Sequence, residues 1–144
     1  MTTISKSALV PYSAEEMYEL VADVESYPRF LPWCAGARVL ARDDSGLTAE
    51  IDMAFGGIHK TFTTRNHHTP GRMDISLVHG PFSRLEGSWR FDQVGDLGSR
   101  ISLDLEFDFA NRLLALAVGP VFSTIANSLV DSFKKRAREV YGPR

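Results

Sequence analysis

The side chains that most often carry chemistry are sparse and scattered in this sequence. His67 and His68 are neighbours, and neighbouring residues of a strand face opposite sides, so the two imidazoles are not expected to share a metal ion. Cys34 is the single cysteine, and no partner for nucleophilic chemistry lies near it in the sequence. The pattern contains no paired carboxylates, glycine-rich phosphate loop or metal-ligand cluster. We therefore predict no catalytic residues, no metal site and no covalent cofactor.

A group of cations lies close to the end of the sequence, at Lys134, Lys135 and Arg138. These side chains are candidates for contact with RNA phosphates or an anionic membrane surface, and the alternative is that they form the solvated end of a helix. The chain of 144 residues carries a formal net charge of -2, which gives no overall attraction to nucleic acid. A nucleic-acid contact would therefore depend on this local group.

The segment that positions these cations is predicted to be one long amphipathic helix over residues 120–141. Its apolar residues recur at helical spacing, and they are Phe122, Ile125, Ala126, Leu129, Phe133, Ala137 and Val140. Gly119 and Pro120 are expected to break or kink any helix formed by residues 111–118. Residues 113–130 carry no charge, which is long enough for a membrane span. The one-sided apolar stripe instead favours a buried or interfacial helix.

Upstream of this helix, the sequence has the two-residue alternation of a sheet with one buried face. The alternation is clearest over residues 101–109, and shorter β-prone runs cover residues 2–10, 47–55, 58–64, 73–79 and 85–91. Residues 67–71 are expected to form a turn. Ser13 and Glu16 form a capping box that starts a short helix. These patterns predict the α+β class, with a curved antiparallel sheet of six or seven strands wrapped around the C-terminal helix.

A sheet curled around one helix leaves space that side chains do not fill, so we predict an internal hydrophobic cavity between them. Lys60, Thr64 and His79 are polar exceptions on the inward side of the strands. The predicted ligand-binding residues are Phe30 and Trp33 of an aromatic loop, Phe62, Leu77, His79, Trp89 and Phe107 of the sheet, and Phe122, Ile125 and Leu129 of the helix. This lining suits an apolar small molecule with a small polar head.

Four short segments carry a resemblance to a known family. Residues 10–15, 18–21, 23–25 and 27–34 read VPYSAE, YELV, DVE and YPRFLPWC. They resemble the N-terminal motif of the coenzyme-Q-binding branch of the START-like, polyketide cyclase-like superfamily, which includes the bacterial ribosome association toxins. The resemblance implies a helix-grip fold, a single domain over residues 1–144 and a cavity under the C-terminal helix.

The resemblance implies more than one function. The interpretation we prefer is binding of ubiquinone or a related isoprenoid in support of respiration, with His79 or Lys60 hydrogen-bonded to a quinone oxygen. The toxin members imply an alternative, which is binding to the large ribosomal subunit so that the subunits do not join. Related proteins with the helix-grip fold catalyse reactions in their cavities, so a cyclase-like enzyme is a third alternative. The single cysteine and the lack of a secretory pattern in residues 1–10 lead us to expect a cytoplasmic protein, or one peripheral at the inner membrane without a transmembrane span.

Overall fold

The computed structural model describes all 144 residues, which form seven strands, two α-helices and one short 3-10 helix. In chain order, the elements are β1 (Thr2–Val10), α1 (Ala14–Ala22), η1 (Val24–Arg29), β2 (Cys34–Asp43), β3 (Gly46–Phe55), β4 (Ile58–Thr69), β5 (Arg72–His79), β6 (Phe82–Val94), β7 (Gly98–Phe109) and α2 (Arg112–Tyr141). The predicted α+β class and the antiparallel sheet beside a long C-terminal helix are both confirmed.

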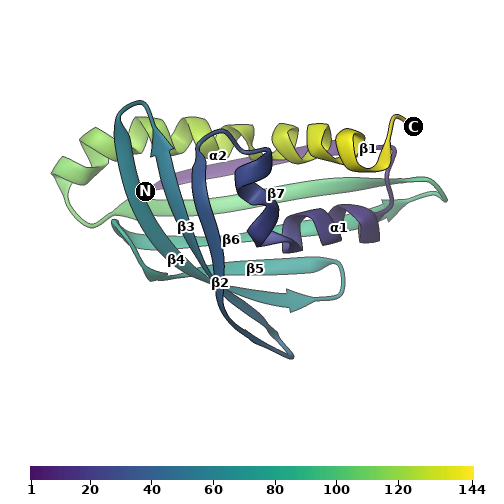
Figure 1. Cartoon of the computed structure of the whole chain (residues 1–144), viewed down its shortest axis with the longest axis horizontal. Helices are drawn as coiled ribbons and strands as arrows, with labels where there is room; N and C mark the ends of the chain where they lie inside the picture. The colour runs from purple at the N-terminus through teal and green to yellow at the C-terminus, as the bar shows by residue number, and fades with distance from the viewer.

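The seven strands form one antiparallel sheet in the order β1-β7-β6-β5-β4-β3-β2. Strands β2 to β7 follow one another as a meander, and β1 is added at the edge beside β7. The alternation in β7 is as predicted, because Leu103, Leu105 and Phe107 are buried while Asp104 and Glu106 between them are more accessible. Figure 1 shows the strong twist of the sheet: β6 and β7 run along α2, whereas β2, β3 and β4 cross that direction steeply.

Helix α2 begins earlier than predicted, at Arg112, and runs without interruption to Tyr141. Asn111 caps its start, since the backbone N–H of Leu114 donates to Asn111 Oδ1 at 2.9 Å. A break at Pro120 is therefore wrong, whereas the kink given as its alternative stays a prediction. Proline lacks the N–H that would reach the Leu116 carbonyl, but both residues are exposed, so water can solvate that carbonyl on the outer side of the helix.

By length and composition, α2 would also be apolar enough to cross a membrane. In this structure, one side of the helix packs against the sheet as a core helix does, with Phe122, Ile125 and Ala126 buried. Leu113 and Leu116, near its start, are exposed. The packing of α2 against the sheet therefore agrees with the prediction of a buried helix.

Helix α1 starts at the capping box predicted from Ser13 and Glu16. The Glu16 N–H donates to Ser13 Oγ at 3.1 Å, and the Ser13 N–H donates to Glu16 Oε1 at 3.0 Å. Past η1, the aromatic loop is tied back to α1 because the Tyr27 hydroxyl donates to the Val21 carbonyl. The residues that follow the capping box are thus held beside the C-terminal half of α2.

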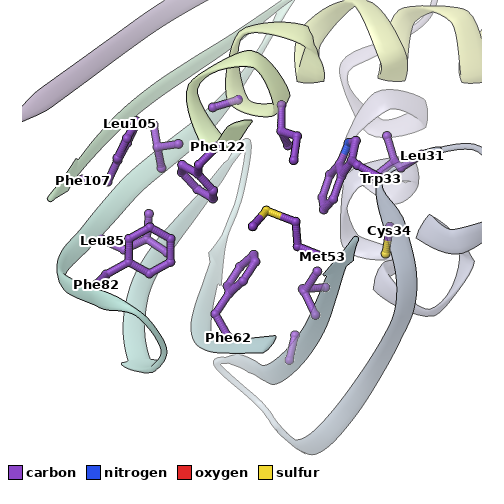
Figure 2. Close-up of a cluster of buried hydrophobic side chains, with 14 of the residues drawn as sticks. Leu31, Trp33, Cys34, Met53, Phe62, Phe82, Leu85, Leu105, Phe107 and Phe122 are labelled. Carbon is purple, nitrogen blue, oxygen red and sulfur yellow. The ribbon is translucent and has the colours of Figure 1, made fainter. Parts of the chain in front are cut away.

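The buried side chains form two clusters along α2. The first gathers 18 buried residues around Phe122, whose ring centroid lies 4.7 Å from that of Phe107 and 4.9 Å from that of Phe82. Figure 2 shows these rings beneath the helix. The second gathers 12 buried residues around Phe133 and includes Met17 of α1. The two clusters together fill most of the concave side of the sheet.

Candidate functional site

A cavity of about 100 Å³ lies between the sheet and α2. Its lining comes from both buried clusters, so the cavity lies where they meet. The lining is apolar apart from the hydroxyl of Tyr27, the indoles and the two side chains Thr64 and Asn66, and it contains no charged residue. Transfer of an unpaired charge into such surroundings is costly, so the cavity suits a neutral group.

Six of the ten predicted ligand-binding residues line this cavity: Trp33, Phe62, Trp89, Phe122, Ile125 and Leu129. They come from the loop before β2, from two strands and from α2, as the sequence pattern anticipated. In Figure 2, Trp33 and Phe122 lie on either side of Met53 beneath α2, and Phe62 lies below them. Thr64, which was expected to face inward, is also part of the wall. The wall is completed by residues that were not predicted as ligand contacts, and they are Val24, Tyr27, Ala49, Ile51, Asn66, Ile75, Leu85, Leu105, Ala126 and Phe133.

Three other predicted residues pack behind or beside the wall. Phe107 is buried, but it lies behind Phe122 and away from the cavity. Phe30 packs on Phe133 with 5.3 Å between ring centroids, and the guanidinium of Arg136 lies 5.0 Å from its ring centre. Leu77 is partly buried against the first cluster. Alternation identified the inward face correctly for Phe107 and Leu77, but it did not show which inward side chains border empty space.

His79 was expected to point inward, and this expectation is wrong. The ladder between β4 and β5 is irregular, because Thr63 pairs with His79 whereas Thr64 pairs with Leu77. Val78 is therefore an extra residue in β5, and the alternation is inverted beyond it. His79 is exposed, and Lys60 is only partly buried and lies outside the cavity wall. Neither residue is placed to bond a ligand held in this cavity.

The polar group in the wall that sequence reasoning missed is Asn66. The sequence pattern ends the predicted strand at Thr64 and starts the predicted turn at His67, whereas β4 continues to Thr69 and places Asn66 on the same face as Phe62 and Thr64. The Thr64 hydroxyl donates to Asn66 Oδ1 at 2.9 Å. Gly46 lets the β2–β3 turn approach this strand, since its φ is +151° and a Cβ there would lie 1.9 Å from the Asn66 carbonyl oxygen. The alternation of inward and outward side chains continues from Phe62 and Thr64 to Asn66, and this pattern could have identified Asn66 as an inward residue.

The indole of Trp33 brings an unusual feature to the wall. Trp33 is 7% exposed, and its Nε1–H is buried without a hydrogen-bond acceptor. An indole nitrogen can only donate, so this group has no other way to be satisfied. Leaving a buried donor unpaired costs about 1–3 kcal/mol. The protein therefore carries an unsatisfied donor next to an apolar cavity.

Two ionisable side chains near the cavity are held in their neutral forms. Burial strongly raises the pKa of Tyr27, whose hydroxyl donates to the Val21 carbonyl. Burial also raises the pKa of Cys34 to about 11, and its thiol donates to the Gly36 carbonyl at 3.3 Å. A thiol in this state is a poor nucleophile at neutral pH. No group of three or more His, Cys, Asp or Glu side chains is gathered to hold a metal ion.

The cations near the end of α2 form a second candidate site, which we call the helix-end cations: Lys134, Lys135 and Arg138. All three are exposed, and none has a carboxylate within 4.0 Å. Their neighbour Arg136 is different, because it pairs with Glu139 at 3.8 Å and covers an aromatic ring. The helix-end cations are thus free to meet an anionic partner.

A protein-family profile described as polyketide cyclase / dehydrase and lipid transport matches residues 10–134. The chain belongs to this family. It is 49% identical to the persistence and stress-resistance toxin PasT of Escherichia coli O6:H1 and 48% identical to the ribosome association toxin RatA of Escherichia coli K12, over 100% of this chain and 92% of each relative. It is 25% identical to the mitochondrial coenzyme Q-binding protein coq10 of Schizosaccharomyces pombe, over 92% of this chain and 84% of that protein.

Solved structures share the same START-like fold. An 18 kDa protein of Caulobacter crescentus is 32% identical with a TM-score of 0.76, over 99% of this chain and 100% of that chain. A START superfamily protein of Mycobacterium smegmatis is 22% identical with a TM-score of 0.83, over 96% and 98% of the two chains. The Zhui aromatase/cyclase of Streptomyces has the same TM-score at 16% identity, over 96% and 95%, which shows a likeness of fold alone. The predicted helix-grip fold is therefore confirmed.

Proposed function

We propose that this protein associates with the ribosome, binding the large subunit so that the two subunits do not join. The observation that carries this proposal is the identity of 48% to ribosome association toxin RatA over the whole chain. The related toxin PasT is equally similar. This was the alternative interpretation of the sequence, and the relatives favour it over quinone carriage as the main function. Such a role would be carried out in the cytoplasm.

The helix-end cations are the surface we assign to ribosomal RNA. Lys134, Lys135 and Arg138 are exposed and unpaired, so they can meet phosphates without first breaking an ion pair. Three arginines on the outer face of the sheet differ in this respect. Arg72, Arg84 and Arg90 each pair with a carboxylate at 2.9, 3.0 and 3.1 Å. With a net charge of -2, the protein depends on local rather than overall charge for this contact.

Cosedimentation with purified large subunits over a range of salt concentrations tests the proposal. Changing all three helix-end cations to alanine should weaken binding and reduce the slope of log K against log salt by about 2–3, as expected for the loss of up to three phosphate contacts. The matched control changes Arg72, Arg84 and Arg90 to alanine, which alters the net charge equally on the outer face of the sheet. Equal losses in both variants would refute the assigned surface, and no binding by the wild type would refute ribosome association.

We infer a second function, binding of an apolar small molecule between the sheet and α2. The specific observation that favours it is the apolar cavity of about 100 Å³, together with the similarity to a protein named for coenzyme Q binding. Ligand pockets usually enclose about 300–1,000 Å³, so the cavity would have to widen to take a ring and its substituents. Ubiquinone or a related isoprenoid is the ligand class we propose, because a long apolar tail would be held by burial alone.

Mass spectrometry of organic extracts from the natively purified protein tests this second function. An isoprenoid or other apolar molecule should copurify with the wild type in near-stoichiometric amount. Replacing Ile125 with tryptophan should exclude it, because the larger side chain occupies the cavity. Circular dichroism checks that the variant is folded. Extracts without any apolar molecule, combined with failure to bind added ubiquinone analogues, would exclude this function and leave ribosome association standing.

A further inference from the structure

We propose that Lys134, Arg138 and Arg144 form a binding site for a phosphate group, in a hollow beside the end of α2. The hollow has a volume of about 270 Å³, and its lining consists of Pro11, Tyr12, Lys134, Arg138, Pro143 and Arg144. The source of the phosphate rests on the first proposed function, which would supply the backbone of ribosomal RNA. The site itself is defined by its own geometry, so it can be tested separately.

The charged side chains that line this hollow are all cations. Lys134 and Arg138 are four residues apart in α2, so they lie on the same side of the helix, one turn apart. Both are exposed, and neither has a carboxylate within 4.0 Å. No aspartate or glutamate belongs to the lining. An anion that entered the hollow would therefore meet positive charge without an opposing acidic side chain in the wall.

Arg144 completes the site and is held in place without a ligand. Its guanidinium carbon lies 5.3 Å from the ring centre of Tyr12 and 5.8 Å from that of Tyr141. Its Nη1 donates to Glu16 Oε1 at 2.6 Å, which offsets one of the three positive charges. Stacking on the rings and one bond through Nη1 leave N–H groups on Nη2 and Nε for a second partner. Arg144 can therefore bind an oxyanion without leaving Glu16.

The segment that carries Arg144 is fixed to the rest of the protein. The Tyr12 hydroxyl donates to the Gly142 carbonyl at 2.7 Å, and the Tyr141 hydroxyl donates to the Glu16 carbonyl at 3.0 Å. In Figure 1, the segment after α2 lies beside the loop that joins β1 to α1. These residues are thus already ordered in the unbound protein, which reduces the entropy lost on binding.

A phosphate group suits this arrangement because its oxygens can bond to cations from α2 and from the segment after it. Each arginine presents a planar fork of N–H groups that matches phosphate oxygens, and Lys134 adds a compact positive charge. The backbone of RNA and a small phosphorylated molecule share this chemistry. Lys135, the third helix-end cation, does not line the hollow. We therefore expect Lys134 and Arg138 to contact phosphate together with Arg144, and Lys135 to add only to the surrounding positive field.

Titration of the nitrogen-15-labelled protein with inorganic pyrophosphate, at constant ionic strength, tests the site. The amide signals of Tyr12, Gly142 and Arg144 should shift and reach saturation. Lys134→Ala, Arg138→Ala and Arg144→Gln should each weaken binding by about 3- to 10-fold. Glutamine keeps the side-chain stem and an amide that can reach Glu16, and circular dichroism checks that each variant is folded. Lys135→Ala is the matched control, because it removes one charge from the same helix outside the hollow, and it should weaken binding by less than about 2-fold.

Cosedimentation of the same variants with large ribosomal subunits identifies the source of the phosphate. With RNA as the source, the three hollow variants should weaken cosedimentation more than Lys135→Ala does. Variants that lose pyrophosphate binding but cosediment normally would support the site and assign it to a small phosphorylated molecule. A wild type without saturable pyrophosphate binding, or a control variant weakened as much as the hollow variants, would overturn the site. Both of these results are independent of ribosome association, which cosedimentation of the wild type tests.

Discussion

Replacing Ala126 with leucine should fill the cavity and stabilise the protein. Ala126 is buried on the side of α2 that faces the sheet, and its side chain lines the cavity. A cavity destabilises a protein by about 24 cal/mol per Å³, so complete filling of about 100 Å³ would contribute about 2.4 kcal/mol. Imperfect fit of the added carbons opposes this gain. We expect a net gain of about 1–2 kcal/mol, because leucine and alanine are both good helix formers.

Urea denaturation followed by circular dichroism measures this change, and calorimetry should show an increase in Tm of about 2–8 °C. The matched control is Ala117→Leu, which makes the same substitution at an exposed position of the same helix. Its free energy of unfolding should stay within about 0.5 kcal/mol of the wild type. The filled variant should also lose the binding of apolar probes, so the gain in stability is linked to a loss of function.

Two results would refute the reasoning. A loss of more than about 1 kcal/mol in the Ala126→Leu variant, with the control unchanged, would mean that the space cannot accept a side chain from this position. A stabilised variant that binds apolar probes as well as the wild type would mean that the ligand lies elsewhere. The first result concerns packing and the second concerns function, so the two can be told apart.

Three further changes test the account of the fold. Phe133→Ala should reduce the free energy of unfolding by about 3–5 kcal/mol in urea titrations, because the buried Phe133 ring packs on three other aromatic rings. The control, Val140→Ala, changes a residue of the same helix that is 47% exposed, and it should alter the free energy of unfolding by less than about 0.5 kcal/mol. Ser13→Ala should cost about 1 kcal/mol through loss of the cap of α1, and an equal cost for the exposed Ser7→Ala would argue against this cause. Because the pKa of Cys34 is raised in the folded state, the unfolded chain loses its thiol proton at a lower pH than the folded protein does. The free energy of unfolding should therefore fall as the pH rises from about 9 to about 11. Urea titrations of Cys34→Ala should lack that part of the pH dependence.

Much of this architecture follows from local sequence pattern. The alternation around Leu103 and Leu105, the capping box at Ser13 and the apolar stripe of the C-terminal helix each reflect a repeat distance fixed by backbone geometry. Such patterns are visible in a single strand or helix, because a residue and its neighbour on the same face are two to four positions apart. They were sufficient for the class of fold and for the inward face of most strands.

The composition of the cavity wall depended on the tertiary structure. The sequence does not show that Val78 is an extra residue opposite β4, because a bulge is defined by the pairing of two strands, and this bulge moves His79 out of the cavity. Phe107 and Phe122 are both inward, yet only Phe122 borders the open space, since one ring packs behind the other. Trp33 lacks an acceptor only because of what residues from other elements place around it. The sequence by itself determined which faces are apolar, whereas packing between distant elements decided where space was left and which polar groups face it.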